Sequence, residues 1–205
     1  EILRCLVGSE MCIRDSVMGI RGERMTRMAT IEIKMLGGFE IRVNGKPVLA
    51  QLAQSRKATA LVQYLVLRRG ERVSHKVLTD TLWAGERSTN PDMALRAILH
   101  RFRLMIDAED LDEMKDCIVT SRGYYQWNPH LDCSVDVFEV NDLSELARKE
   151  SDAEKRSRIY EQIVNLYDGR LLPQSASEPW VESVSVRPVS YTHPEPTRHL
   201  RISYA

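Results

Sequence analysis

The sequence predicts an α+β fold, with a small antiparallel sheet first, then three helices and a hairpin, and a further helical part towards the C-terminus. Three observations predict it. Apolar and polar residues alternate over 31–43, as in half-buried strands. Apolar residues recur at helical spacing over 56–106. Two short aromatic or β-branched runs flank a glycine over 117–127, which favours a hairpin.

The N-terminal sheet is predicted from two alternating segments, 31–36 and 39–43. Asn44-Gly45 follows, and this pair is a strong signal for a two-residue hairpin turn, because a type I′ turn needs positive φ at both central residues. We therefore expect a short strand over 47–49 to pair back onto the second strand.

Two helices should follow, with Ser55 and Ser74 as their N-caps. The first runs from Arg56 to about Arg69 and ends at Gly70. Its expected core face is Ala58, Leu61, Val62, Leu65 and Val66. The second continues to about Trp83, and a connection over 85–89 follows. Its expected inward residues are Val77, Leu78 and Leu82.

The third helix, 91–106, is the most informative segment. Asn90 can cap it and Pro91 suits its first position. Its expected buried stripe is Leu95, Ile98, Leu99, Phe102 and Ile106. The other side is basic, with Arg96, His100 and Arg101, and with Arg103 at the rim. Such a helix could enter a DNA major groove, although the helix alone leaves open an ordinary surface helix with solvated arginines.

A hairpin with Ser121-Arg122-Gly123 at its turn follows an acidic loop. Sheet, three helices and hairpin, in this order, describe a winged helix with the third helix as reader and the hairpin as wing. We expect four aromatic residues to be core rather than DNA-stacking groups: Trp83, Phe102, Tyr124 and Tyr125.

Charge is balanced over the 205 residues, with 29 Lys+Arg against 29 Asp+Glu, so local patches matter more than the total. One basic group consists of Arg56, Lys57, Arg68, Arg69 and Arg72, and an acidic patch follows the third helix at Asp107, Glu109, Asp110, Asp112 and Glu113. A DNA-binding part joined to a partner-binding part fits this division. No apolar run approaches the roughly 20 residues of a membrane span, and no signal peptide is evident, so we expect a cytoplasmic protein.

Little in the sequence predicts metal, cofactor or catalytic chemistry. The cysteines Cys5, Cys12, Cys117 and Cys133 lack paired spacing, so we expect free thiols. His130 with Cys133 would be half of a zinc site without its other half. Ser74, His75 and Asp80 could be cast as a catalytic set, but Ser74 fits a helix cap and sequence neighbours do not make a triad. We therefore expect no enzyme, no metal and no cofactor.

The two ends show neither helical nor strand periodicity. Residues 1–28 and 183–205 are expected to be unstructured. Within them, 5–16 and 187–198 resemble strings produced when sequencing-adapter DNA is translated, so we expect both ends to be artefacts and the natural protein to continue. Genuine disordered tails are the alternative.

Residues 30–129 resemble the OmpR/PhoB-type effector domain, most closely in the antibiotic regulatory protein (SARP, or AfsR-like) branch. The residues that carry the resemblance are Leu36-Gly-Gly-Phe39, Ser55-Arg-Lys-Ala58, Leu82-Trp83, Ala94-Leu95, Phe102-Arg103 and Gly123-Tyr124. The resemblance implies that Arg96, His100 and Arg101 face the bases and that Arg122 lies on the wing. Arg103 is expected to meet phosphate. Arg56 and Lys57, in the first turn of their helix, also suit a phosphate, with plain solvent exposure as the alternative.

Residues 134–182 resemble the start of the bacterial transcriptional activator domain, a tetratricopeptide-like helical array. The matching residues are Val135-Asp-Val-Phe-Glu139, Tyr167-Asp-Gly-Arg-Leu-Leu-Pro173 and Pro179-Trp180-Val181. The expected apolar positions are Leu143, Leu146 and Ala147 in one helix and Ile159, Ile163, Val164 and Leu166 in the next. Because repeats bury their faces on neighbours, we expect a lone pair to be marginal, with Ile159, Ile163 and Trp180 partly uncovered. No segment is long enough for a receiver domain.

Together these features predict a sequence-specific DNA-binding transcriptional regulator, and the resemblance implies an activator. Its expected partners are double-stranded DNA and RNA polymerase, and it is expected to dimerise on direct repeats. The alternative is a helical-repeat signalling or scaffold fragment whose winged helix binds protein. A steep fall of DNA affinity with salt would separate the two, because neutralising phosphates predicts it.

Overall fold

The computed structural model of the chain describes residues 30–84 and 90–181. The expectations for residues 1–28, 85–89 and 183–205 concern segments outside these ranges. The first sheet has four strands in the order β3-β2-β1-β7. Its strands are β1 (Ile31–Lys34), β2 (Glu40–Val43), β3 (Lys46–Val48) and β7 (Cys133–Val135). The first three form an antiparallel meander, whereas β7 pairs with β1 in parallel.

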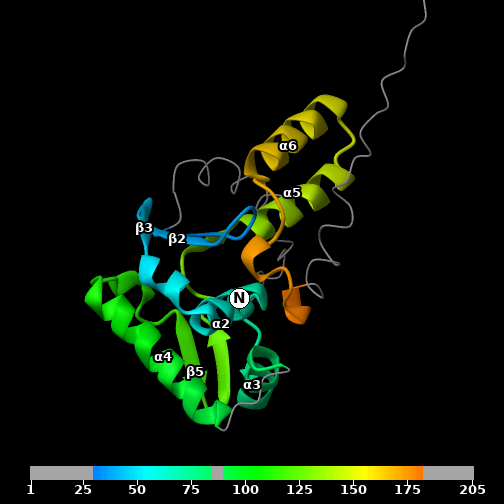
Figure 1. Ribbon diagram of the computed structural model, residues 1–205. Helices are drawn as coiled ribbons and strands as arrows, with labels where there is room; N and C mark the ends of the chain where they lie inside the picture. The colour runs from blue at the N-terminus through cyan, green and yellow to red at the C-terminus, as the bar shows by residue number, and fades with distance from the viewer. Residues whose placement is uncertain (1–29, 85–89, 182–205) are drawn as a thin grey trace, which may run out of the picture.

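The three central helices and a second sheet complete the first part of the fold (Figure 1). The helices are α2 (Arg56–Leu67), α3 (His75–Leu82) and α4 (Pro91–Ala108), with short 3₁₀ turns η1 (Ala50–Gln54) and η2 (Asp112–Met114). The second sheet has the order β4-β6-β5, from β4 (Val73–Ser74), β5 (Ile118–Ser121) and β6 (Tyr124–Trp127). All strand pairs in this sheet are antiparallel.

The local signals in the sequence produce these elements. Asn44 and Gly45 adopt φ values of 51° and 75°, as a type I′ turn requires. The side chains of Ser55, Ser74 and Asn90 each accept a hydrogen bond from a backbone N–H in the first turn of α2, α3 and α4. All five residues of the α4 stripe and all five of the α2 core face are buried. These predictions are therefore confirmed.

Two residues predicted to lie in the core are exposed instead. Val77 is 44% exposed, because α3 buries the face that carries Leu78, Thr79 and Leu82. Tyr124 is 41% exposed, because it precedes buried Tyr125 on β6, and neighbouring strand residues point to opposite faces. The other predicted core aromatics are fully or partly buried.

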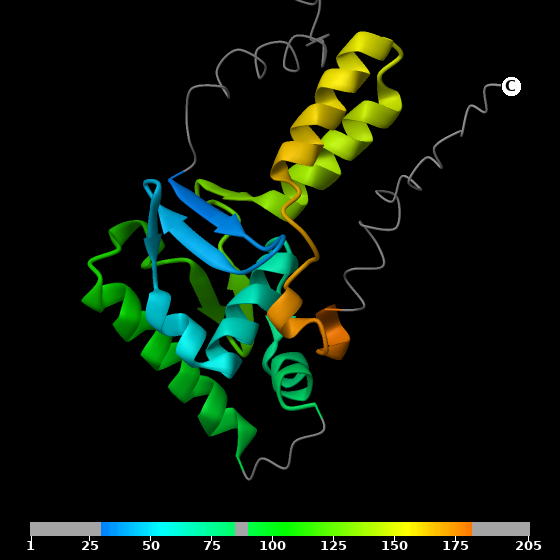
Figure 2. The same cartoon turned by 45° about the horizontal axis from the view of Figure 1, so that its top comes forward.

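The C-terminal part is a helical pair, α5 (Asp136–Lys149) and α6 (Ala153–Leu166), which extends away from the first sheet (Figure 2). After α6 the chain returns through the 3₁₀ turn η3 (Pro173–Ser175) and runs beside α2 in both views. On the way, Leu171 forms a bridge with Leu36 of the first sheet region. Within the pair, Ala147 is buried, whereas Leu146 and Val164, two of the apolar positions of the helical pattern, are 40% and 71% exposed.

The expectation that Ile159, Ile163 and Trp180 would be partly exposed is wrong. Ile159 and Ile163 are 6% and 7% exposed, because α5 and α6 pack on each other. Trp180 is 7% exposed and meets the ring of Tyr64 on α2 edge-on, with ring centroids 5.5 Å apart. Ser175 adds a hydrogen bond from its Oγ to Oε1 of Gln63, 3.0 Å away. The segment that follows the pair thus finds its partner surface on α2.

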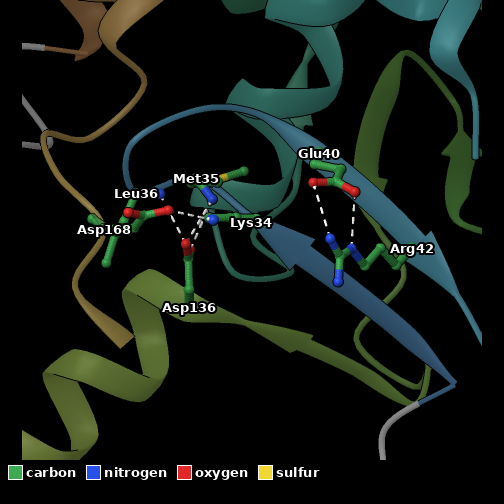
Figure 3. Close-up of polar contacts among 7 residues, drawn as sticks. All are labelled: Lys34, Met35, Leu36, Glu40, Arg42, Asp136 and Asp168. Carbon is green, nitrogen blue, oxygen red and sulfur yellow. Dashed lines mark hydrogen bonds and ion pairs between the residues drawn. The ribbon is translucent and has the colours of Figure 1, made fainter. Parts of the chain in front are cut away.

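Asp136, at the start of α5, fastens the helical pair to the end of β1 (Figure 3). Its carboxylate accepts hydrogen bonds from the backbone N–H groups of Met35 and Leu36, each at 2.8 Å, and of Val137 at 2.7 Å. Burial raises the pKa of Asp136, and these three donors act in the opposite direction. Nearby, Lys34 and Asp168 form an ion pair at 2.5 Å.

Close backbone packing at the same place explains one glycine of Leu36-Gly-Gly-Phe39. Gly37 adopts a φ of 76°, and its N–H donates to the carbonyl of Arg170. A Cβ at Gly37 would lie 2.3 Å from the carbonyl oxygen of Asp168, so a side chain cannot fit there.

Asp136→Asn is expected to lower the free energy of unfolding by about 1–3 kcal/mol, because an amide offers one acceptor oxygen where the carboxylate offers two charged ones. Urea unfolding measures the loss. Asp168→Asn is the control, since it removes a carboxylate from an exposed ion pair, which contributes little. Equal effects of the two changes would contradict the anchoring role of Asp136.

Candidate nucleic-acid interface

The outward face of α4 carries uncompensated positive charge. Arg96, His100 and Arg101 are exposed, opposite the stripe that α4 buries against the rest of the domain. Within residues 30–84 and 90–181, none of the three forms an ion pair or a side-chain hydrogen bond. Because guanidinium groups in a rigid fork suit bidentate recognition, Arg96 and Arg101 can reach out to a polyanion or to base edges.

The residues of the other basic group are largely paired with other groups of the protein itself, at its surface. Arg56 pairs with Glu178 at 2.5 Å. Arg69 pairs with Asp142 at 3.2 Å and lies over the ring of Phe138. These contacts join α2 to the C-terminal part of the chain. They also neutralise charge that the sequence left free for an external partner.

Lys57 is also held from within. Its Nζ donates to the carbonyl of Leu82 at the end of α3 and lies 5.6 Å from the centre of the Trp83 ring. This ammonium therefore satisfies a carbonyl near the C-terminal end of α3, where positive charge is favourable. Sequence reasoning missed this role because α2 and α3 meet only in the folded chain.

The β5–β6 hairpin places Arg122 at its tip. Arg122 and Gly123 adopt φ values of 42° and 81° and form a two-residue turn between the paired residues Ser121 and Tyr124. Arg122 is exposed there. Arg103 extends from α4 to this hairpin, where its Nη2 donates to Oγ1 of Thr120 on β5 at 3.1 Å. The hairpin and α4 are thus joined side by side.

The N-terminal end of α4 is positioned by His75, which begins α3. Its Nε2 lies 2.7 Å from Oδ1 of Asp92 in the first turn of α4. Its Nδ1 lies 3.1 Å from the hydroxyl of Tyr125 on β6. Among the described residues, the carboxylate that His75 contacts is that of Asp92, and Ser74 serves as the α3 cap. His75 ties together three elements at the edge of the basic face.

The segment that follows the C-terminal end of α4 is acidic, and several of its carboxylates form hydrogen bonds or ion pairs within the protein. Glu109 accepts a hydrogen bond from the backbone N–H of Leu49 at 2.8 Å. Glu113 accepts one from the side-chain amide of Asn44, and Asp112 pairs with Lys115. Charge along α4 thus changes from positive in its middle to negative at its C-terminal end, which favours a polyanion along the middle of the helix and away from that end.

No group of three or more metal-ligating side chains gathers among the residues that the structure describes. Cys133 is partly buried on β7, and Cys117 is buried before β5; both are free thiols. Burial raises the pKa of each thiol to about 12. In the described part of the chain, no helix has the length and apolar character needed to cross a membrane.

Cys117 and Cys133 are expected to resist alkylation in the native protein. A thiol pKa of about 12 leaves on the order of a thousandfold less thiolate at neutral pH than an ordinary cysteine. Iodoacetamide at pH 7.5, followed by mass spectrometry of the two peptides, measures this. Both thiols should react at ordinary rates in 6 M guanidinium, and fast native labelling of Cys117 would contradict its buried position.

Comparison with known proteins finds a likeness to a solved structure. No protein-family model matches the chain, and no curated protein matches it. A solved structure of EmbR from Mycobacterium tuberculosis, in complex with a low-affinity phosphopeptide, is similar with a TM-score of 0.64 and 17% sequence identity. The match covers 77% of this chain and 41% of the EmbR chain. The chain therefore shares the fold of part of EmbR and spans about two fifths of its length.

Proposed function

We propose that this chain is a sequence-specific DNA-binding regulator of transcription, of the OmpR/PhoB type and the antibiotic regulatory protein branch. The observation that carries the proposal is the outward face of α4, where Arg96, His100 and Arg101 stand exposed without ionic partners in the described chain. The fold shared with EmbR and the sequence resemblance of residues 30–129 support it.

In this proposal α4 lies in the major groove. Arg96 and Arg101 each donate to the O6 and N7 atoms of a guanine, and His100 makes a single contact. The β5–β6 hairpin is the wing, and Arg122 at its tip contacts the backbone or the minor groove. Arg103, beside Thr120, contacts a phosphate.

Arg56 and Lys57 are weaker candidates for phosphate contacts than the sequence alone indicates. Each has a partner inside the protein, Glu178 for Arg56 and the carbonyl of Leu82 for Lys57. A phosphate would have to compete with these partners, so we assign both residues a minor share of the DNA affinity.

We further propose that residues 134–182 begin a tetratricopeptide-like activator domain. It would contact RNA polymerase while two copies of the winged helix occupy direct repeats. This role needs no enzymatic chemistry and no cofactor. The sequence resemblance of the segments at 135–139, 167–173 and 179–181 supports it.

Selection of bound duplexes from random DNA by the 205-residue chain tests the proposal. Arg96→Ala should weaken the selected site by about 1–3 kcal/mol and relax preference at one position, as expected for a lost bidentate contact. Arg122→Ala should instead weaken selected and random DNA alike and lower the salt slope by roughly one unit or less. Fluorescence anisotropy at several salt concentrations measures both.

The contrast between the two arginines decides the outcome. If Arg96→Ala and Arg122→Ala lowered affinity equally on selected and random DNA, α4 would not be the reading helix. If no duplex were enriched and binding did not fall with salt, the chain would not be a DNA-binding protein. Lys57→Ala is a poor substitute for Arg122→Ala, because it also removes a contact between α2 and α3.

A further inference from the structure

The outward face of α4 is not uniformly basic. Its centre line, directly opposite the buried stripe, carries apolar side chains: Met93, Ala97 and Leu104. Met93 is 66% exposed and Leu104 is 51% exposed. Arg96 and Arg101 flank this line on its two sides.

The N-terminal half of this face is the half suited to DNA. Its one first-turn acid, Asp92, is directed to His75 at 2.7 Å. The positive end of the α4 dipole also lies at this end and favours phosphate nearby. Towards the other end, Asp107 is exposed, and the acidic patch follows. Those acids repel phosphate, and of the three apolar residues Met93 and Ala97 lie furthest from them, whereas Leu104 lies closest to them.

An apolar side chain within a major groove has one apolar group to meet on the base edges, the C5-methyl of thymine. Met93 and Ala97 are about 6 Å apart along the helix, which matches roughly two base-pair steps. Arg96 lies between them in sequence and is the residue assigned to guanine above. A guanine contact and a methyl contact therefore fall within the same short stretch of DNA.

We propose that Met93 and Ala97 are specificity-determining residues that recognise thymine methyl groups within about two base steps of the guanine bound by Arg96. The inference rests on the proposed function and adds to it the kind of base that the apolar line selects. If these apolar residues do not contact thymine, the alternative is that they form an interface between protein chains.

The test uses duplexes selected from random DNA by the 205-residue chain, with deoxyuridine placed at each thymidine in turn. Deoxyuridine lacks only the C5-methyl group. At one or two positions near the guanine whose recognition Arg96→Ala abolishes, the exchange should weaken binding about threefold to fivefold, the size expected for one buried methyl group. Fluorescence anisotropy gives the ratio of the two dissociation constants.

The variants assign the effect to side chains. Met93→Ala should remove the preference for thymidine over deoxyuridine at one position. Met93→Leu keeps an apolar side chain and should retain this preference. Ala97→Ser should remove it at the other position. Leu104→Ala is the matched control, because it truncates an exposed apolar residue of the same helix face about 10 Å along α4 from Ala97. At the positions near the guanine bound by Arg96, its ratio of dissociation constants should equal that of the unchanged chain. Thermal melts check that all four variants are folded.

Three results would overturn the inference. Deoxyuridine could be neutral at every position of an enriched site. Leu104→Ala could change the ratio as much as Met93→Ala does. Met93→Ala could convert an oligomer into a monomer in ultracentrifugation without changing the ratio, which would make the line a protein interface. By contrast, failure to enrich any duplex would contradict the proposed function itself, so the two failures are distinguishable.

Discussion

Replacing Trp180 by alanine is expected to lower the free energy of unfolding by about 3–5 kcal/mol, as for a buried large aromatic residue. Trp180 is 7% exposed and packs edge-on against Tyr64, which is itself 3% exposed in the middle of α2. The truncation therefore opens a cavity between the C-terminal segment and the central helix of the first part. Urea unfolding followed by circular dichroism measures the loss.

Tyr160→Ala is the matched control for Trp180→Ala. Tyr160 is an aromatic residue of the same C-terminal part, but it is 50% exposed on α6. Its loss should change stability by no more than about 0.5 kcal/mol. Hydrogen exchange adds a second readout, since α2 and α5 should lose protection together in Trp180→Ala. If Trp180→Ala were as mild as Tyr160→Ala, the C-terminal segment would not be part of the folded unit.

Leu95→Ala is expected to destabilise the fold by about 2–5 kcal/mol, because the side chain is fully buried where α4 meets the core. It does not touch the outward face. At temperatures where the variant is folded, its preference between selected and random DNA should therefore be unchanged. Thermal unfolding and anisotropy measure the two quantities separately.

Leu104→Ala serves as the comparison for Leu95→Ala on the same helix. Leu104 is 51% exposed, so its truncation should leave stability within about 0.5 kcal/mol. A loss of base preference in folded Leu95→Ala, or a large loss of stability in Leu104→Ala, would mean that the buried and the outward faces of α4 have been assigned the wrong way round. The assignment of Arg96 to the bases would then be wrong.

The features that the sequence predicted correctly are those that depend on residues close together in the chain. Caps at Ser55, Ser74 and Asn90, the Asn44-Gly45 turn and the stripe of α4 depend on residues close in the chain, and the structure has all of them. Exposure within short elements was harder to predict. Val77 and Tyr124 are apolar or aromatic, but the element that carries each buries its other face. Periodicity over so few residues does not determine which face is buried.

Contacts between distant residues escaped sequence reasoning for a different reason. The partners Arg56 and Glu178, Lys57 and the Leu82 carbonyl, or His75 and Asp92 are set by the packing of whole elements, and nothing in the local pattern marks them. The same holds for Trp180, which was expected to need a further helical repeat and instead packs on α2. Charge in the sequence indicated a basic surface, but packing decides which of those charges are free.

During synthesis, β1 leaves the ribosome roughly 100 residues before its parallel partner β7. Until then, one edge of β1 and the N–H groups of Met35 and Leu36 lack the partners that residues 133–136 provide. An open strand edge is a template for pairing with another chain. The helices and the hairpin can therefore fold during synthesis before the first sheet is complete. A protein cut after residue 129 would keep the edge of β1 open and would tend to aggregate.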